Sequence, residues 1–195
     1  KDAEPGGSYE ISKCCYKIAK GGTYTFTAET TQNYITVDTS EEVEIYLKDV
    51  TIDTESGYEH PAISIDGSSD VTIYAEGTNY LQGGKRDHWL YTNDGYAGIR
   101  VATGAQVTVL GNGSLETHGG GGARGAAGIG GNYGNSCGKI TIGDDTYSPT
   151  VTATGGGSGG GNDGAAGIGS GDNIAVLITL LVIRRILLID GLVSF

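Results

Sequence analysis

Hydrophobic and polar residues alternate along most of this chain. From Gly22 onward, apolar side chains recur two positions apart in short runs separated by glycine, asparagine and aspartate. The first runs hold Tyr24 and Phe26, Ile35 and Val37, Val43, Ile45 and Leu47, and Val50 and Ile52. Such alternation, rich in Val, Ile, Thr and Tyr, is typical of half-buried β-strands, and no sustained helical period precedes residue 173. The pattern therefore predicts an all-β fold.

One short phrase returns along the chain and divides it into blocks. Gly-Ala-Ala-Gly-Ile-Gly stands at 125–130 and again at 164–169, with weaker echoes at 97–101 and 61–65. A fixed phrase between variable glycine-rich stretches indicates a stacked repeat. The predicted strands then fall into triplets at 34–37, 43–47 and 50–53; 62–65, 71–74 and 79–81; 98–101, 106–109 and 114–117; and 127–130, 139–142 and 150–153. A fifth block opens at Ala166.

These triplets predict a right-handed parallel β-helix, a solenoid with three strands per coil and about four to five coils. Stacked coils would place equivalent side chains in interior ladders. One ladder would hold Ile45, Ile73, Val109 and Ile142, and another Ile52, Leu81, Leu115 and Val151. The isoleucines of the first strands mark the repeat: Ile35, Ile63, Ile99, Ile129 and Ile168. A β-sandwich would also have many short strands, but it would not explain why one phrase opens successive blocks of three.

The pattern divides the chain into three parts. Residues 1–20 are predicted to be an N-terminal cap or linker, 21–171 the β-helix domain, and 172–195 an atypical apolar tail. In the tail glycine becomes rare, both faces become apolar, and Arg184 and Arg185 interrupt the run too early for a membrane span. The tail is interpreted either as a cap over the open end of the column or as the product of a reading-frame shift.

Composition and charge disfavour some classes of binding partner. The chain has 36 glycines and 3 prolines among 195 residues, and its formal net charge is −11. Nucleic acid binding depends on clustered Lys and Arg, so this charge disfavours nucleic acid and anionic membranes as partners. An anionic polysaccharide would need a cation such as calcium between the two negative partners, whereas a neutral sugar would not. The three cysteines do not indicate a disulfide framework.

The connection from the end of one predicted coil to the start of the next takes nearly all the long loops, which would lie along one edge. The loop over 82–96 is the densest candidate site. Trp89, with Tyr91 or Tyr96, would form an aromatic platform for a sugar ring, while polar side chains reach its hydroxyls. The polar candidates are Asp87, Arg86 and Asn93. The alternative is that Trp89 folds back over the column and the charges are solvated.

The metal candidates are hard oxygen ligands. Asp87 with Asp94, or Asp144 with Asp145, would bind calcium together with loop carbonyls. No EF-hand spacing is present. The histidines His60, His88 and His118 lack the fixed spacing of a zinc site, so zinc is not predicted.

Several strands together resemble the bacterial carbohydrate-binding β-helix domains, which are secreted or surface proteins similar in fold to pectate lyases. The resemblance covers about residues 20 to 171 and is carried by the segments at 22–26, 35–38, 43–52, 62–65, 71–74 and 77–81. It implies a non-catalytic module that binds plant-type polysaccharide outside the cell, with calcium where the polysaccharide is acidic. It carries no fixed ligand residues onto this sequence.

Two other functions remain open. One is a structural or adhesive surface stalk without a small ligand, in which the loops are spacers. The other is a pectate-lyase-like enzyme, which would need a basic residue beside clustered acidic ligands. Asp53, Asp66, Asp70 and Glu76 lie at predicted strand ends, but their spacing marks no catalytic pair.

Overall fold

The computed structural model describes residues 1–55, 59–85, 94–122, 124–157 and 164–171. Within these ranges the chain forms short strands and one 3-10 turn, with no α-helix. The elements are β1 (Asp2–Ala3), β2 (Ser8–Glu10), η1 (Ile11–Lys13), β3 (Tyr16–Ile18), β4 (Gly22–Thr31), β5 (Ile35–Val37), β6 (Glu42–Asp53), β7 (Ile63–Ile65), β8 (Asp70–Glu76), β9 (Thr78–Gln82), β10 (Ile99–Val101), β11 (Gln106–Gly111), β12 (Ser114–His118), β13 (Ile129–Gly130), β14 (Lys139–Ile142), β15 (Thr150–Thr154) and β16 (Ile168–Gly169). The described ranges hold no helix with the length and hydrophobicity that a membrane-spanning segment needs.

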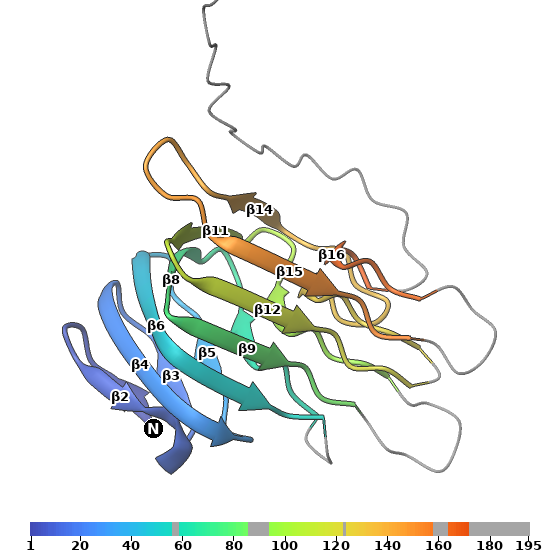
Figure 1. The fold of residues 1–195 in the computed structure, drawn as a ribbon, viewed down its shortest axis with the longest axis horizontal. Helices are drawn as coiled ribbons and strands as arrows, with labels where there is room; N and C mark the ends of the chain where they lie inside the picture. Colours follow the sequence, from blue (N-terminus) through green and yellow to red (C-terminus); the bar gives the residue numbers. More distant parts are fainter. Residues whose placement is uncertain (56–58, 86–93, 123, 158–163, 172–195) are drawn as a thin grey trace, which may run out of the picture.

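The strands form two parallel sheets (Figure 1). The seven-stranded sheet has the order β1-β3-β5-β7-β10-β13-β16. The nine-stranded sheet has the path β14-β11-β8-β6-β9-β12-β15, with β4 paired to β6 and β2 paired to β4. The pairing is parallel because the chain crosses from one sheet to the other and returns one repeat later, beside its own earlier strand.

The fold is all-β, but the prediction of a β-helix solenoid with three strands per coil is wrong. The corner expected between Leu47 and Val50 lies inside the single strand β6. There Asp49 adopts a left-handed φ of 52°, so the chain bends without ending the strand. The first part of β6 pairs with β8 and the last part with β9. The predicted second and third strands therefore belong to one nearly closed, barrel-like sheet, and the seven-stranded sheet is the second layer.

The core lies between the sheets and follows the alternation of the sequence. In β6, Val43, Ile45 and Leu47 are buried while the residues between them face outward. The strand register confirms one predicted side-chain ladder, in which Ile45, Ile73, Val109 and Ile142 pair in succession. The first-strand isoleucines also pair in succession, from Ile35 to Ile168.

The other predicted ladder, from Ile52 to Val151, is wrong by two residues at the pairing of Leu81 with Leu115. Ile52 pairs with Leu81, as expected, but Leu81 pairs with Thr117, while Leu115 pairs with Asn79 and Val151. The reason is that Asn79 faces the interior at 1% exposure, a polar residue at a position expected to be apolar. Its carboxamide accepts the N–H of Val50 at 3.0 Å and donates to the carbonyls of Glu76 and Ser114. These bonds fix the corner between β8 and β9.

The first twenty residues add strands to both sheets. β1 and β3 extend the seven-stranded sheet, and β2 extends the nine-stranded sheet. The rings of Tyr9, Tyr16 and Phe26 form a cluster at this end, with centroids 4.8 to 5.8 Å apart. The apolar tail at 172–195 lies outside the described residues, so both interpretations of it stay predictions.

Candidate functional site

A row of tyrosines stands on the outer face of the nine-stranded sheet. Tyr46 in β6 and Tyr74 in β8 follow buried isoleucines, so alternation turns both rings outward, and the two residues pair directly across the strands. Their ring centroids are 4.5 Å apart and their planes differ by 11°. Strand pairing thus holds two aromatic rings parallel on the surface.

A third tyrosine reaches this row from the loop between β14 and β15. One carboxylate oxygen of Asp144 accepts the N–H groups of Thr146 and Tyr147 at 2.7 and 2.6 Å, and the Asp144 N–H donates to the Tyr147 carbonyl at 2.9 Å. This tight turn, typical of aspartate, fixes the backbone at Tyr147. The Tyr147 ring lies 5.6 Å from that of Tyr74 at 78°, so the two planes form an angled wall.

These rings line a groove of about 560 Å³. Its residues are Tyr46, Tyr74, Tyr147, Glu76, Gly77, Thr78, Gly111, Asn112 and Gly113. Gly77 has φ of 69°, and a Cβ placed there would collide with the carboxylate of Asp49, so the corner needs glycine. Gly111 and Gly113, on the same lining, approach the backbone of Ala75 and Gly77 too closely to carry a Cβ. Such a groove combines apolar surface with a few polar groups, as ligand sites do.

Burial and charge affect the titration of the groove's tyrosines. Burial, and then the charge of Glu44, raises the pKa of both Tyr46 and Tyr74. Both phenols are neutral at pH 7, as ordinary tyrosines are, and can donate hydrogen bonds; the raised pKa keeps them neutral to higher pH. Glu76 lies 3.1 Å from the ammonium of Lys48, which is on the strand beside it. Glu76 and Asn112 place a carboxylate and a carboxamide on the same lining.

The residues predicted for ligand binding fall mostly outside the described chain. Arg86, Asp87, Trp89, Tyr91 and Asn93 lie outside it. Tyr96 lies inside and is half-buried; its N–H donates to the carbonyl of Gly84, and its own carbonyl accepts the N–H of Gly120. The structure therefore places the base of the 82–96 loop against the next glycine-rich loop.

The described metal candidates lie in two different loops. An Asp94 carboxylate oxygen is 3.7 Å from the Arg124 guanidinium, whose centre is 4.5 Å from the ring centroid of Tyr133. Asp144 holds the turn before Tyr147, and Asp145 is exposed beside it. Among the described residues, no group of three or more His, Cys, Asp or Glu side chains could hold a metal ion. Calcium at these positions stays a prediction.

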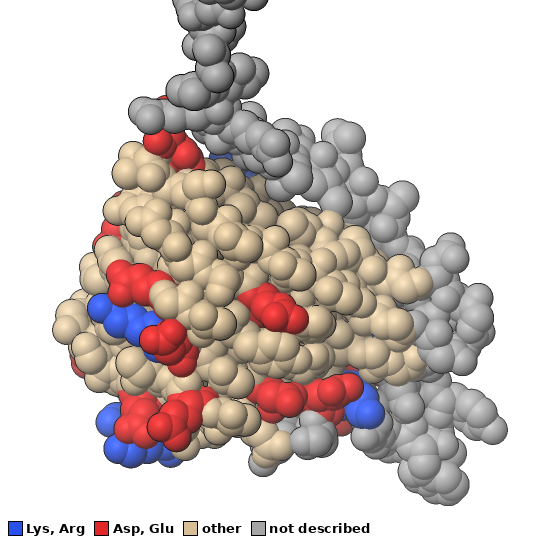
Figure 2. Space-filling view, viewed as in Figure 1, with Lys and Arg blue, Asp and Glu red and all other residues tan. Residues whose placement is uncertain are grey.

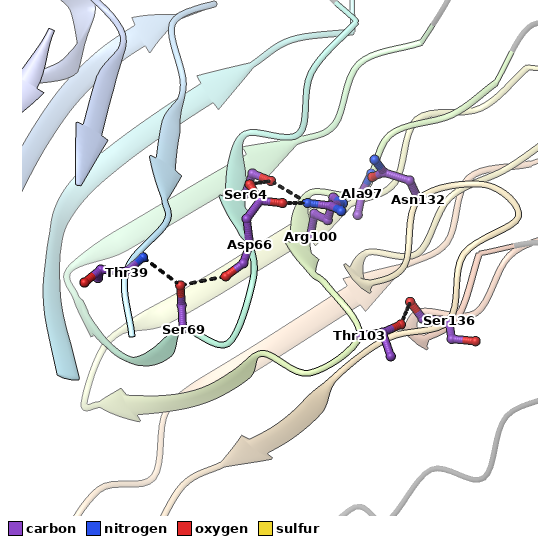
Figure 3. A network of polar contacts seen from close by, with 9 residues as sticks. All are labelled: Thr39, Ser64, Asp66, Ser69, Ala97, Arg100, Thr103, Asn132 and Ser136. Carbon is purple, nitrogen blue, oxygen red and sulfur yellow. Dashed lines mark hydrogen bonds and ion pairs between the residues drawn. The ribbon is translucent and has the colours of Figure 1, made fainter. Parts of the chain in front are cut away.

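A separate polar cluster lies on the seven-stranded sheet (Figure 3). Arg100 donates to the carboxylate of Asp66 and, at 3.1 Å, to the hydroxyl of Ser64, which itself donates to Asp66 at 2.9 Å. Ser69 donates to the Asp66 carbonyl and accepts the N–H of Thr39. Partial burial lowers the pKa of Arg100, but the adjacent carboxylate matches its charge. These groups bond one another, so the cluster joins β7, β10 and the β5–β6 loop.

The sequence analysis predicts a site in the long loops and does not predict the tyrosine groove. The sequence nevertheless contains a pattern that could have indicated it. Tyr46 and Tyr74 both follow an interior isoleucine, and aligning Ile45 with Ile73 places the two tyrosines side by side on the outer face. Tyr147 gives no such signal because it stands in the loop between two strands.

Known proteins were compared with this chain by sequence, by family model and by structure. The search of curated proteins and the search of solved structures returned no match. A model of the family described as "Carbohydrate-binding domain-containing protein" matches residues 12–129, more than half of the chain. The matched part includes Tyr46, Tyr74 and the glycine corners of the groove, and ends before Tyr147. The chain therefore belongs to this carbohydrate-binding domain family.

Proposed function

We propose that this protein is a non-catalytic module that binds polysaccharide in the tyrosine groove. Family membership supports a carbohydrate-binding role. The observation that carries the assignment to this site is the aromatic wall of Tyr46, Tyr74 and Tyr147 beside Glu76 and Asn112. Sugar rings present C–H groups to aromatic carbon and hydroxyls to polar side chains, and the groove offers both.

The composition of the groove supports a binding role over hydrolysis. Hydrolysis of a glycosidic bond uses two carboxyl groups on opposite sides of the bond. The described lining holds one carboxylate, Glu76, and this group is ion-paired with Lys48. A paired carboxylate can still accept sugar hydroxyls, because an ionised acceptor forms strong hydrogen bonds.

We further propose a class of ligand and a cellular location for this module. The resemblance described above supports a plant-type polysaccharide and a role in a secreted or surface-anchored bacterial protein. Calcium belongs to the proposal for acidic polysaccharides, because the chain's charge of −11 would repel an anionic chain without a bridging cation. The loop over 82–96, with Trp89 at its centre, stays a second predicted contact region.

Titration calorimetry of the full chain against soluble plant polysaccharides, with and without calcium, tests this proposal. Tyr147→Ala should weaken binding about ten-fold or more, because aromatic contacts dominate such sites. Tyr80→Ala is the matched control, since Tyr80 is a half-exposed outward tyrosine on β9, packed against His118. Loss of binding in Trp89→Ala with no effect of Tyr147→Ala would move the site to the long loop. A folded wild type that binds none of the polysaccharides would favour the adhesive stalk.

A further inference from the structure

The groove carries more negative than positive charge close to its tyrosines. Glu44 lies two positions before Tyr46 on the outward side of β6, and its carboxylate accepts the Thr23 hydroxyl at 2.9 Å. Glu76 lines the groove itself, and Asp144 lies in the turn that holds Tyr147. One carboxylate thus lines the aromatic wall, and the charges of two more, Glu44 and Asp144, act on its Tyr74.

Lys48, on the strand beside Glu76, is already paired. Its ammonium lies 3.1 Å from the Glu76 carboxylate, and within the described residues neither Glu44 nor Asp144 forms an ion pair. The excess of negative charge extends beyond the groove. On the face seen in Figure 2, Asp and Glu cover more surface than Lys and Arg. A ligand entering the groove therefore meets a negative potential.

This potential acts differently on the two classes of polysaccharide. A uronic acid unit carries a carboxylate, and juxtaposed like charges weaken binding and discriminate against a ligand. The hydroxyls of a neutral sugar instead donate to carboxylates, and such charge-assisted hydrogen bonds are stronger than neutral ones. The carboxylates that repel one class therefore help to hold the other.

We infer that the tyrosine groove selects neutral glycans and excludes polyuronates when no divalent cation is present. The inference rests on the proposed function and defines the ligand class of the same groove. Its structural basis is the position of Glu44, Glu76 and Asp144 around Tyr46, Tyr74 and Tyr147, with Lys48 matched by Glu76.

The test compares oligosaccharides of equal length on the full chain by titration calorimetry, in EDTA and low salt. The neutral probes are cellopentaose, xylopentaose and mannopentaose, and the acidic probe is pentagalacturonate. At least one neutral probe should bind about ten-fold more tightly than pentagalacturonate. Added salt should narrow this difference, because it screens exposed charges.

Glu44→Lys tests whether charge at the groove causes the selection. It should strengthen pentagalacturonate binding about ten-fold and weaken neutral binding by a smaller factor. Asp38→Lys makes the same change of charge next to β5 of the other sheet, where Asp38 is exposed, and should leave the selection intact. Glu44→Gln serves in the same comparison if the lysine variant does not fold, with a smaller gain expected.

Three outcomes would overturn the inference. Equal binding of pentagalacturonate and the neutral probes in EDTA would do so while leaving the proposed function intact. An equal gain from Glu44→Lys and Asp38→Lys would assign the effect to net charge and not to the groove. Failure of the folded wild type to bind any probe, both in EDTA and with calcium added, would remove the proposed function itself.

Discussion

The rings of Tyr46 and Tyr74 lie parallel, 4.5 Å apart, because the two residues occupy the same outward position on paired strands. This spacing is close to the separation of neighbouring strands in a sheet. The backbone register therefore sets the ring contact, and the pair contributes both to the groove and to the stability of the sheet.

A double-mutant cycle should measure this contact. Tyr46→Ala and Tyr74→Ala should show a coupling energy of about 0.5–1.5 kcal/mol in urea unfolding, because stacked aromatic pairs contribute about this much beyond their burial. Tyr46→Ala combined with Tyr80→Ala is the control, since Tyr80 packs against His118 instead. Additive effects of Tyr46→Ala and Tyr74→Ala would contradict a stabilising stack.

Asn79 should be more important for stability than its polarity suggests. It is 1% exposed and its carboxamide bonds the backbone of Val50, Glu76 and Ser114. Asn79→Leu would continue an apolar ladder with Leu115, yet we expect a loss of about 3 kcal/mol, because buried backbone groups would lose their partners. Urea unfolding measures this loss.

Asn112→Leu is the matched control for that measurement, since Asn112 is exposed at the corresponding corner of the next repeat. It should change the free energy of unfolding by less than about 0.5 kcal/mol. A stable Asn79→Leu protein would show that apolar packing can replace the hydrogen bonds.

Gly130 should tolerate no side chain. Its φ is 142°, and a Cβ there would collide with the carbonyl oxygen of Gly169 on the neighbouring strand. Gly130→Ala should therefore cost about 4 kcal/mol or more, or prevent folding. Gly134→Ala is the control, because Gly134 also has a positive φ, of 68°, but has open space around it. Its expected cost is about 1–2 kcal/mol, from backbone strain alone. Equal thermal stabilities of the two variants would contradict the steric argument.

Alternation and repetition were enough to predict much of the strand arrangement. Alternating apolar residues placed β5, β8, β11 and β14 within one or two residues, and the repeated phrase aligned Ile35 with Ile63 and Ile99. These features are local or periodic, so they can be read from one sequence. The number of sheets could not be read in this way. It depends on whether hydrogen bonding continues through the bend at Asp49, which joins the two halves of β6.

The site was harder to predict than the strands. The sequence predicts a site in the long loop with Trp89, because function often lies in loops; Trp89 lies outside the described residues, so this stays a prediction. The tyrosine groove lies on the outer face of paired strands, where an isolated tyrosine in the sequence does not indicate a site. Tyr74 acquires its partners from residues 28 positions before it and 73 after it. Register predicts the first partner, whereas the second depends on the turn held by Asp144.

We expect Tyr16, in the N-terminal aromatic cluster, to make the stability of the fold depend on pH in the alkaline range. The hydrogen bond with Cys14, followed by burial, raises the pKa of Tyr16 to about 12, above the ordinary tyrosine value of 10.0. Below pH 10 the phenol is neutral in both states, so its contribution to stability is fully present. Between pH 10 and 12 the unfolded chain releases the proton while the folded chain retains it, so stability falls as pH rises.

Urea unfolding at pH 8 and pH 11 tests this sign. From pH 8 to pH 11 the wild type should lose about 1 kcal/mol more than Tyr16→Phe, because the variant lacks the titrating group. Comparing each protein with itself at the two pH values removes the constant effect of losing the hydroxyl, and subtracting the two losses removes the contribution of the other buried tyrosines. An equal loss in both proteins would show that the Tyr16 phenol titrates alike in the folded and unfolded chains, and that neither its hydrogen bond with Cys14 nor its burial against Tyr9 and Phe26 retains its proton.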